Sequence, residues 1–340
     1  MTKKINKELF FSKTKEYLVD YLTIQRGKSS HTVNSYRDAL TVFRRYVKEE
    51  KGLSIMKFYF ENCTRELVLD FIAYLKRLGY AESSCNQRLS ALKAYLWYVS
   101  DDDILLQPIT LSISRIPFLR EPKMIRPVVP DDALTAILSA PKNSKLGIRD
   151  RTIMVVLYDT AIRLNELLSL KISDINIASD NPYLRIHGKG DKERIVTVTS
   201  KTVSHLLLYM KYFHPDTTDR NKFFFYTVIK GHRSSMSPGN VERIVKKYAE
   251  QVRVDYPEMP EKVSPHMMRR TRATNLYQDG VELELVSRIL GHSSTQTTRI
   301  YATPSVEMLR EAMENQNQAS DEKPLWEGKE EEMARLCGLR

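Results

Sequence analysis

The segment YLRIHGKGDKERIVTV, residues 183–198, decides the fold class of this chain of 340 residues. Residues 183–187 and 193–198 are rich in β-branched and aromatic side chains, and the turn between them is glycine-rich and charged. Two such runs joined by a short glycine-containing turn are typical of a β-hairpin. The patterned segments on both sides repeat their apolar residues at helical spacing instead. The sequence therefore predicts a mainly α fold with a small β-sheet, in the α+β class.

Helical patterns surround this hairpin. Apolar residues three and four positions apart mark one buried face of each expected helix. Before the hairpin we expect helices over 131–139, 150–160 and 163–170, and after it over 201–213, 239–252, 266–279 and 282–290. These elements predict one domain over residues 131–314.

Residues 1–107 carry helical patterns throughout. We expect helices over residues 8–25, from Ser29 or Ser30 to about 47, from Thr64 to Gly79, and from Ser83 or Ser84 to about 99. Ser and Thr are placed here as N-caps, and Gly79 as a stop signal. Four helices in about 95 residues form a small bundle.

Residues 108–130 separate the two predicted domains. Five of the 14 prolines fall in this segment. Proline removes a backbone donor and restricts φ, which excludes a long helix here. The segment is also basic, with Arg115, Arg120, Lys123 and Arg126 against Glu121. Such a linker could lie along a phosphate backbone or serve as a solvated spacer, and the sequence leaves both open.

Composition excludes several classes of protein. An apolar content of 42% excludes a disordered chain, and 12 glycines are too few for collagen. No apolar run approaches the roughly 18 residues of a membrane span, and no signal peptide is recognisable, so we expect a cytoplasmic protein without a membrane partner. Three cysteines without CxxC spacing predict neither a disulfide framework nor a zinc site.

The charge balance points to a polyanionic partner. The formal net charge is +11, although residues 318–340 are acidic overall. No segment has the pattern of a basic membrane-surface helix, which favours nucleic acid over a lipid surface. Candidate DNA contacts outside the apolar stripes and in the linker are Arg37, Arg44, Arg88, Lys93, Arg115, Arg120 and Lys123. Each of these side chains could touch DNA or be an ordinary solvated charge.

Four short blocks in the second domain carry the candidate chemistry. They are TAIRLNELLSL at 160–170, GKG at 188–190, SPHMMR at 264–269, and LGH at 290–292 with a tyrosine nine residues later. The functional groups that they supply are those of Arg163, Lys189, His266, Arg269, His292 and Tyr301. These donors form no plausible metal cage, but they suit a phosphate whose charge grows in the transition state. A tyrosine hydroxyl can then be the nucleophile.

Taken in this order, the blocks resemble the tyrosine recombinase (integrase) family over roughly residues 10–310. The resemblance implies a helical, SAM-like core-binding domain at 1–107, a basic linker at 108–130 and a tyrosine recombinase catalytic domain at 131–314. It transfers the catalytic roles to the six residues that match the family pattern: Arg163, Lys189, His266, Arg269, His292 and Tyr301.

The resemblance also implies a mechanism and partners. Tyr301 would attack the scissile phosphate to give a 3′-phosphotyrosyl link, and Arg163 and Arg269 would hold the nonbridging oxygens together with His292. Lys189 would protonate the departing 5′-oxygen, and His266 would help to accept the tyrosine proton. The implied partner is double-stranded DNA with specific recombination sites. The implied assembly is a homo-tetramer acting through a Holliday junction without metal or cofactor, and a monomer or weak oligomer when free of DNA, in the service of a mobile element.

Three positions depart from the family pattern. Ala161 stands where glycine is common, Arg270 where a histidine often follows, and Arg272 where an apolar residue is frequent. We expect Arg270 and Arg272 to bind flanking phosphates or to pair with an acid such as Glu282.

Two other functions remain open. A type IB topoisomerase uses nearly the same chemistry but relaxes DNA as a monomer, and a product assay on DNA with two sites separates it from a recombinase. A non-catalytic DNA-binding regulator would share the charge and the helices, but it should lack a complete catalytic set.

Residues 315–340 form a tail with its own pattern. A polar connector precedes the apolar residues Leu325, Trp326, Met333, Leu336 and Leu339. A short amphipathic helix on a connector is not stable alone, so it must dock. By resemblance we expect it to dock on a neighbouring protomer, with docking on its own catalytic domain or disorder as alternatives.

Overall fold

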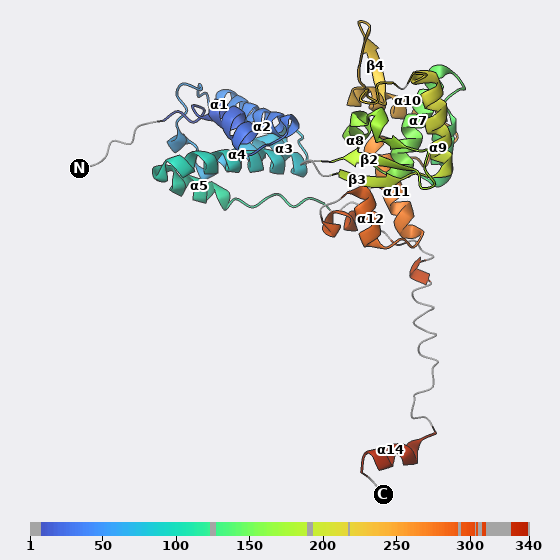
Figure 1. The fold of residues 1–340 in the computed structure, drawn as a ribbon. Coiled ribbons are helices and arrows are strands. Elements are labelled where there is room, and N and C mark those ends of the chain that lie inside the picture. Colours follow the sequence, from blue (N-terminus) through green and yellow to red (C-terminus); the bar gives the residue numbers. More distant parts are fainter. Residues whose placement is uncertain are drawn as a thin grey trace, which may run out of the picture. The chain divides into compact units, whose positions relative to one another are not determined.

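The computed structural model describes residues 8–122, 127–188, 193–216, 218–291, 294–302, 304, 308–310 and 328–338. The chain divides into two compact units, Met1–Ile125 and Arg126–Arg340 (Figure 1). Both units are mainly helical, and the strands form one sheet of three and one of two. This confirms the predicted fold class of a mainly α chain with small β-sheets.

The first unit is the predicted helical bundle. Its helices are α1 (Thr14–Glu16), the π-helix η1 (Tyr17–Gln25), α2 (Ser30–Glu49), α3 (Arg65–Arg77), α4 (Glu82–Asp102) and α5 (Gln107–Ser114), with 3-10 turns η2 (Phe60–Asn62) and η3 (Ile104–Leu106). Ser29 and Thr64 cap α2 and α3 by accepting backbone N–H groups, as predicted. The expected helix over 8–25 begins only at α1, because Phe10 donates its backbone N–H to Phe58 in an extended pairing.

Aromatic side chains fill the core of the first unit. The Phe10 ring contacts those of Phe43, Phe58 and Phe60 at centroid distances of 5.4, 5.3 and 5.0 Å. The Tyr95 hydroxyl donates a hydrogen bond to the Phe10 carbonyl at 2.5 Å, which pairs the one polar group of this buried ring. The N-terminal segment is therefore anchored to α4 as well as to the bundle.

The predicted start of the linker at residue 108 is wrong, because the helical bundle continues beyond it. Residues 107–114 form α5, and Pro108 stands in its first turn, where a missing N–H costs nothing. Ile113 and Ile116 are buried in the core of the first unit. Burial of these apolar side chains therefore stabilises the segment as a helix of the bundle although it contains proline. Residues 108–116 belong to the bundle. Residues 123–126, which include Lys123, lie outside the described part of the chain.

The second unit places helices around a small sheet. The helices are α6 (Asp131–Ser139), α7 (Lys145–Thr160), α8 (Leu164–Ser169), α9 (Ser200–Phe213), α10 (Pro238–Val252), α11 (Pro265–Gln278), α12 (Leu283–Leu290) and α14 (Glu330–Leu336), with 3-10 turns η4 (Ile172–Asp174), η5 (Thr295–Thr297) and η6 (Arg299–Tyr301). The bounds agree with the sequence predictions except at α7, which begins five residues early because the Ser144 side chain caps it by accepting the Gly147 N–H.

The predicted hairpin is present. Strands β2 (Tyr183–His187) and β3 (Glu193–Thr197) pair antiparallel, from Tyr183 opposite Thr197 to His187 opposite Glu193, and β1 (Ile175–Asn176) adds a third strand. A second hairpin, β4 (Tyr226–Ile229) and β5 (His232–Ser235), was not predicted.

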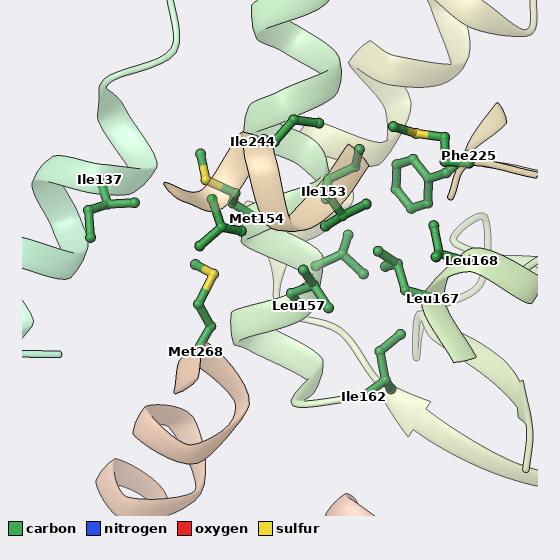
Figure 2. Close-up of a cluster of buried hydrophobic side chains, with 14 of the residues drawn as sticks. Ile137, Ile153, Met154, Leu157, Ile162, Leu167, Leu168, Phe225, Ile244 and Met268 are labelled. Carbon is green, nitrogen blue, oxygen red and sulfur yellow. The ribbon is translucent and has the colours of Figure 1, made fainter. Parts of the chain in front are cut away.

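Helix α7 runs through the core of the second unit. Ile153, Met154 and Leu157 of this helix lie among side chains from α8, α10 and α11 (Figure 2). Burying each large aliphatic side chain is worth about 1.5–3 kcal/mol. This packing fixes the end of α7, and with it the turn that leads to Arg163.

None of the helices in the described ranges is long and apolar enough to cross a membrane.

Candidate active site

The turn after α7 places the first predicted catalytic residue. Ala161 ends the helix in the left-handed conformation, with φ of 49°, and is fully buried. Glycine adopts this conformation without strain, which explains why it is common here, but alanine is the smallest side chain that can replace it. Arg163 follows as the N-cap residue of α8, and its backbone N–H donates to Glu166 at 2.8 Å.

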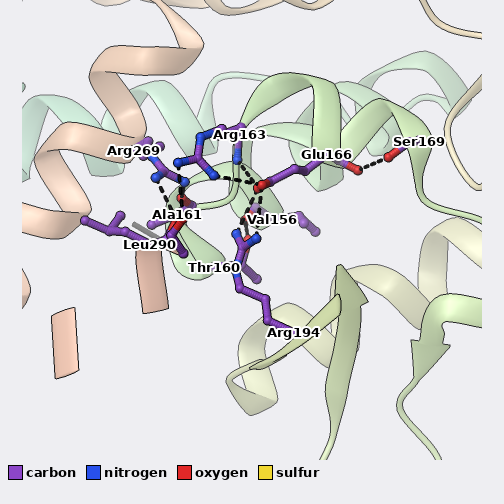
Figure 3. A network of polar contacts seen from close by, with 10 residues as sticks. Val156, Thr160, Ala161, Arg163, Glu166, Ser169, Arg194, Arg269 and Leu290 are labelled. Carbon is purple, nitrogen blue, oxygen red and sulfur yellow. Dashed lines mark hydrogen bonds and ion pairs between the residues drawn. The ribbon is translucent and has the colours of Figure 1, made fainter. Parts of the chain in front are cut away.

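Glu166 holds two arginines at once. Its Oε1 accepts hydrogen bonds from Nη1 of Arg163 at 2.9 Å and from Nη1 of Arg194 at 3.0 Å. Its Oε2 also accepts Nη2 of Arg194 at 2.8 Å (Figure 3). Burial by itself would raise the pKa of this carboxyl, but the hydrogen bonds from Arg194 and Arg163 outweigh burial and lower it below its ordinary value. The carboxylate therefore stays ionised and fixes the Arg163 fork.

Arg269 is the second guanidinium of the site. It is 2% exposed, and it donates Nη1 to the Ala161 carbonyl at 2.5 Å and Nη2 to the Leu290 carbonyl at 2.8 Å. Burial, and then the neighbouring charge of Arg163, lower the pKa of Arg269 to about 10. The group is still cationic at neutral pH. Two carbonyls from separate segments thus orient a charge beside Arg163.

Gly291 links these groups to the segment after α12. It has φ of 62°, and its carbonyl accepts Nη2 of Arg163 at 3.3 Å. A Cβ at this position would lie 2.7 Å from Cζ of Arg194. Both the left-handed backbone and the contact with the guanidinium therefore favour glycine.

Tyr301 lies in the same region. It is 3% exposed in η6 and packs with Ala161, Ala273, Val286 and Leu290. Tyr301 also acts electrostatically on Arg269, where it opposes part of the fall in the pKa. The structure therefore brings Arg163, Arg269 and Tyr301 together, although Arg163 stands far ahead of the other two in the sequence.

His266 is a further predicted catalytic residue, at the start of α11. His266 is exposed in the first turn of α11, whose N-cap Ser264 accepts the Met267 N–H at 3.3 Å. It precedes Arg269 by three positions, so both lie on one side of the helix. Lys189 and His292 lie outside the described residues.

The candidate DNA contacts of the first unit divide into two groups. Arg37, Arg44, Arg115 and Arg120 are exposed. By contrast, Lys93 donates to the carbonyls of Ser114 and Ile116 at 3.0 and 2.6 Å, and burial lowers its pKa. The Arg88 guanidinium lies 4.3 Å from the centre of the Tyr80 ring and donates to Ser84 at 2.9 Å. Lys93 and Arg88 thus stabilise the bundle itself.

Arg270 and Arg272 also have partners within their own unit. Arg270 is 9% exposed and donates a hydrogen bond to the Pro127 carbonyl. Arg272 pairs with Asp159 at 3.5 Å, so the expectation of Glu282 as its acid was wrong. The reason is that Asp159, at the end of α7, lies beside α11 and also caps α9 through Thr199. Both arginines therefore hold their own unit together, and their phosphate contacts stay a prediction.

Arg194 is the site residue that the motifs missed. It stands opposite Ile186 in the hairpin register, on the face where Leu184 and Val196 are buried. A charged residue at an inward-facing strand position must find a buried partner, so the strand alternation was a usable signal.

Two family models match this chain. The model described as "Phage integrase family" matches residues 127–308, and "Phage integrase, N-terminal SAM-like domain" matches residues 15–101. The chain belongs to the phage integrase family. As a member it is a tyrosine-type site-specific recombinase, which confirms the enzyme class expected from the sequence.

Relatives of this integrase-family chain span nearly its whole length. It is 27% identical to "Tyrosine recombinase XerD" of Staphylococcus epidermidis over 300 residues, covering 87% of this chain and 95% of the relative. It is 28% identical to "Tyrosine recombinase XerA" of Pyrococcus horikoshii over 311 residues, covering 92% and 96%.

Solved structures share the fold. The XerH site-specific recombinase bound to a palindromic difH substrate matches with a TM-score of 0.66 and 23% identity, covering 85% of this chain and 80% of that one. The Tn1549 transposon integrase in complex with a circular intermediate DNA matches with a TM-score of 0.65 and 18% identity, covering 91% and 99%.

The site is a set of cationic donors around a phenol. The two guanidiniums can hold a phosphodiester, since each arginine can bind two phosphate oxygens at once. The neighbouring hydroxyl can then attack the phosphorus. Among the residues that the structure describes, no group of three or more His, Cys, Asp or Glu side chains could hold a metal ion.

Proposed function

We propose that this recombinase cuts and rejoins double-stranded DNA at specific sites through a 3′-phosphotyrosyl intermediate and a Holliday junction, in the service of a mobile element. The observation that carries the proposal is the convergence of Arg163, Arg269 and Tyr301 around the turn at Ala161. Solved relatives of this fold are bound to DNA, among them a transposon integrase. A type IB topoisomerase activity remains the alternative, to be separated by its products.

Each side chain has a role that follows from its chemistry. Tyr301 supplies the attacking oxygen, and its bond to phosphorus replaces the bond to the departing 5′-oxygen. Arg163 and Arg269 stabilise the charge that grows on the nonbridging oxygens, and Glu166 and the two backbone carbonyls hold these arginines in place beforehand. His292 adds a hydrogen bond to the same oxygens. Lys189 protonates the 5′-oxygen.

His266 completes the proton transfers. It is exposed at the start of α11, three residues before Arg269. We assign it the role of general base, which helps to accept the proton of the Tyr301 hydroxyl. Because no step in this scheme uses a metal or a nucleotide, we propose that cleavage needs neither.

The assembly extends beyond one chain. We propose four protomers on two duplexes, with the helical bundle through residue 116 and the basic linker through 130 contributing to DNA binding and residues 131–314 to catalysis. Arg37, Arg44, Arg115 and Arg120 are exposed candidates for phosphate contact. Lys123 of the linker is a further candidate. We further propose that the tail after residue 314 docks on a neighbouring protomer. In α14 of this tail, Met333 and Leu336 are 43% and 79% exposed, and such apolar groups gain by burial against a partner.

A suicide substrate, nicked beside the scissile phosphate, tests the proposal. The wild-type chain should become covalently attached to it, and Tyr301→Phe should not, because one hydroxyl is the nucleophile. Binding should change by no more than about 1 kcal/mol, the worth of one hydrogen bond. Tyr277→Phe, on α11 of the same unit, is the matched control. An adduct with the Tyr301→Phe variant would assign the nucleophile to another tyrosine. A relaxed plasmid without recombinant products would favour the topoisomerase.

A further inference from the structure

The hairpin β4–β5 has no assigned role. Its base is anchored to the second unit: Tyr226 donates its hydroxyl to the Phe213 carbonyl at 2.9 Å, and Ser235 donates to the Leu168 carbonyl at 2.7 Å. Phe225 and Met236, which flank the two strands, are buried. Figure 1 shows β4 extending away from the helices of this unit. A fixed base thus carries a projecting ribbon.

The outer half of the ribbon is exposed to solvent. Residues 228–234 are all exposed, and Val228 and Ile229 are 61% and 60% exposed. The turn has two consecutive residues with positive φ, Lys230 at 49° and Gly231 at 80°. This two-residue turn matches the right-handed twist of the strands and keeps the tip narrow. A two-stranded ribbon in water is only marginally stable, so the exposed tip suits a partner.

The charge of this segment is one-sided. The hairpin residues 226–235 contain two cations, Lys230 and Arg233, and no Asp or Glu. Arg233 lies with its guanidinium 4.5 Å from the centre of the Tyr226 ring, which directs it along one face of the ribbon. A partner with dense negative charge fits this segment better than a neutral protein surface.

The register of the hairpin fixes which side chains share a face of the tip. Val228 pairs with Arg233 and Ile229 with His232. Neighbouring residues in a strand point to opposite faces, so each face of the tip carries one aliphatic and one nitrogen-bearing side chain. A flat protein interface would need the aliphatic groups on one face. A groove with two charged walls and a floor of polar base edges and thymine methyl groups is matched on both faces.

We propose that the β4–β5 hairpin is a DNA-binding ribbon that enters the major groove of the duplex, with Lys230 and Arg233 on phosphates. The major groove is wide enough for a two-stranded β-ribbon and presents thymine methyl groups to aliphatic side chains. The inference rests on the proposed function only in taking duplex DNA as the partner. Ser235 is hydrogen-bonded to α8, whose N-cap is Arg163, so the ribbon is fixed relative to the site. It would therefore add a DNA contact away from the cleaved phosphate.

The test measures binding of the full chain to a labelled duplex of arbitrary sequence across salt concentrations. Removing two phosphate contacts with Lys230→Gln and Arg233→Gln should reduce the slope of log K against log salt by about 1.8, and weaken binding roughly 10- to 30-fold near physiological salt. Lys201→Gln with Lys211→Gln, two exposed lysines of α9, removes the same charge elsewhere and should leave the slope within about 0.5.

Three outcomes would overturn the inference. The first is an unchanged slope in the hairpin variant, and the second is an equal loss in the α9 control, which would reduce the effect to net charge. The third is that Val228→Thr with Ile229→Thr breaks up protein oligomers and leaves DNA binding intact, which would assign the tip to a second copy of this chain. Cleavage of a suicide substrate by the wild-type chain at saturating DNA is measured in parallel. If wild type fails to cleave while the slope still falls, the recombinase proposal fails and the ribbon stands.

Discussion

The pairing of Arg194 with Glu166 makes the sharpest prediction about this site. In Arg194→Met the Glu166 carboxylate loses two charge-assisted hydrogen bonds, of 3.0 and 2.8 Å. The two side chains are 18% and 7% exposed, so solvent screens the pair little. Breaking one partner of a buried pair costs about 3–5 kcal/mol. Because Arg163 still donates to Glu166, we expect the lower end, about 3 kcal/mol of unfolding free energy at neutral pH.

The pH dependence of this loss has a definite sign. The pKa of Glu166 is lowered in the folded state from an ordinary value of 4.5. Its contribution to stability is therefore present above that value and is lost as pH falls through the folded-state pKa. The difference between wild type and Arg194→Met should accordingly be largest at neutral pH and should shrink as the solution is acidified below 4.5. Urea unfolding at several pH values measures it.

The cleavage activity of Arg194→Met should also fall, even at a temperature where the variant is folded. Glu166 orients Arg163, and a misplaced Arg163 guanidinium should slow suicide-substrate cleavage by about 10- to 100-fold. Arg194→Lys keeps the charge but not the fork and should not restore the rate. Arg185→Met, on the exposed face of the same hairpin, is the matched control. It should change neither the free energy of unfolding nor the activation free energy of cleavage by more than about 0.5 kcal/mol.

A double-mutant cycle completes the test. Glu166→Gln removes the charge from the other side, so the double variant should be more stable than the sum of the single losses implies, by about 1.5 kcal/mol or more. Additive losses, or a loss below about 1 kcal/mol in Arg194→Met, would refute the reasoning that the pair is a coupled buried unit.

Three further predictions concern the neighbouring elements. Gly291→Ala should destabilise the chain by about 1–3 kcal/mol, since its Cβ meets the Arg194 guanidinium and its φ is positive; a melting temperature equal to that of wild type would contradict this. Lys189→Ala should slow cleavage, and a 5′-bridging sulfur should rescue it, because a thiolate leaves without a proton; Arg163→Ala should not be rescued, and equal rescue of both would reject the assigned roles. Deleting residues 318–340 should leave suicide cleavage intact but weaken strand exchange between two sites, whereas faster cleavage would indicate a tail that inhibits its own chain.

Local patterns were sufficient for most of the fold. Apolar spacing located most helices of both units, and Ser29 and Thr64 were predicted correctly as the caps of α2 and α3, because capping and amphipathic burial act within one or two turns. The β2–β3 hairpin was equally visible, since its turn and its strands are contiguous in sequence. Where packing competed with a local signal, prediction failed: α5 forms despite Pro108, because Ile113 is buried in the bundle.

The site divides in the same way. The order and chemistry of the candidate residues follow from the sequence, because the matching motifs are short and ordered. The folded chain is needed to show that Arg194 holds Glu166, that Arg272 pairs with Asp159 and not Glu282, and that Arg270 donates a hydrogen bond to the Pro127 carbonyl. Each of these choices joins groups that are distant along the chain. A buried charge takes whichever partner the packed helices and strands bring within hydrogen-bond reach, and that distance is a property of the fold as a whole.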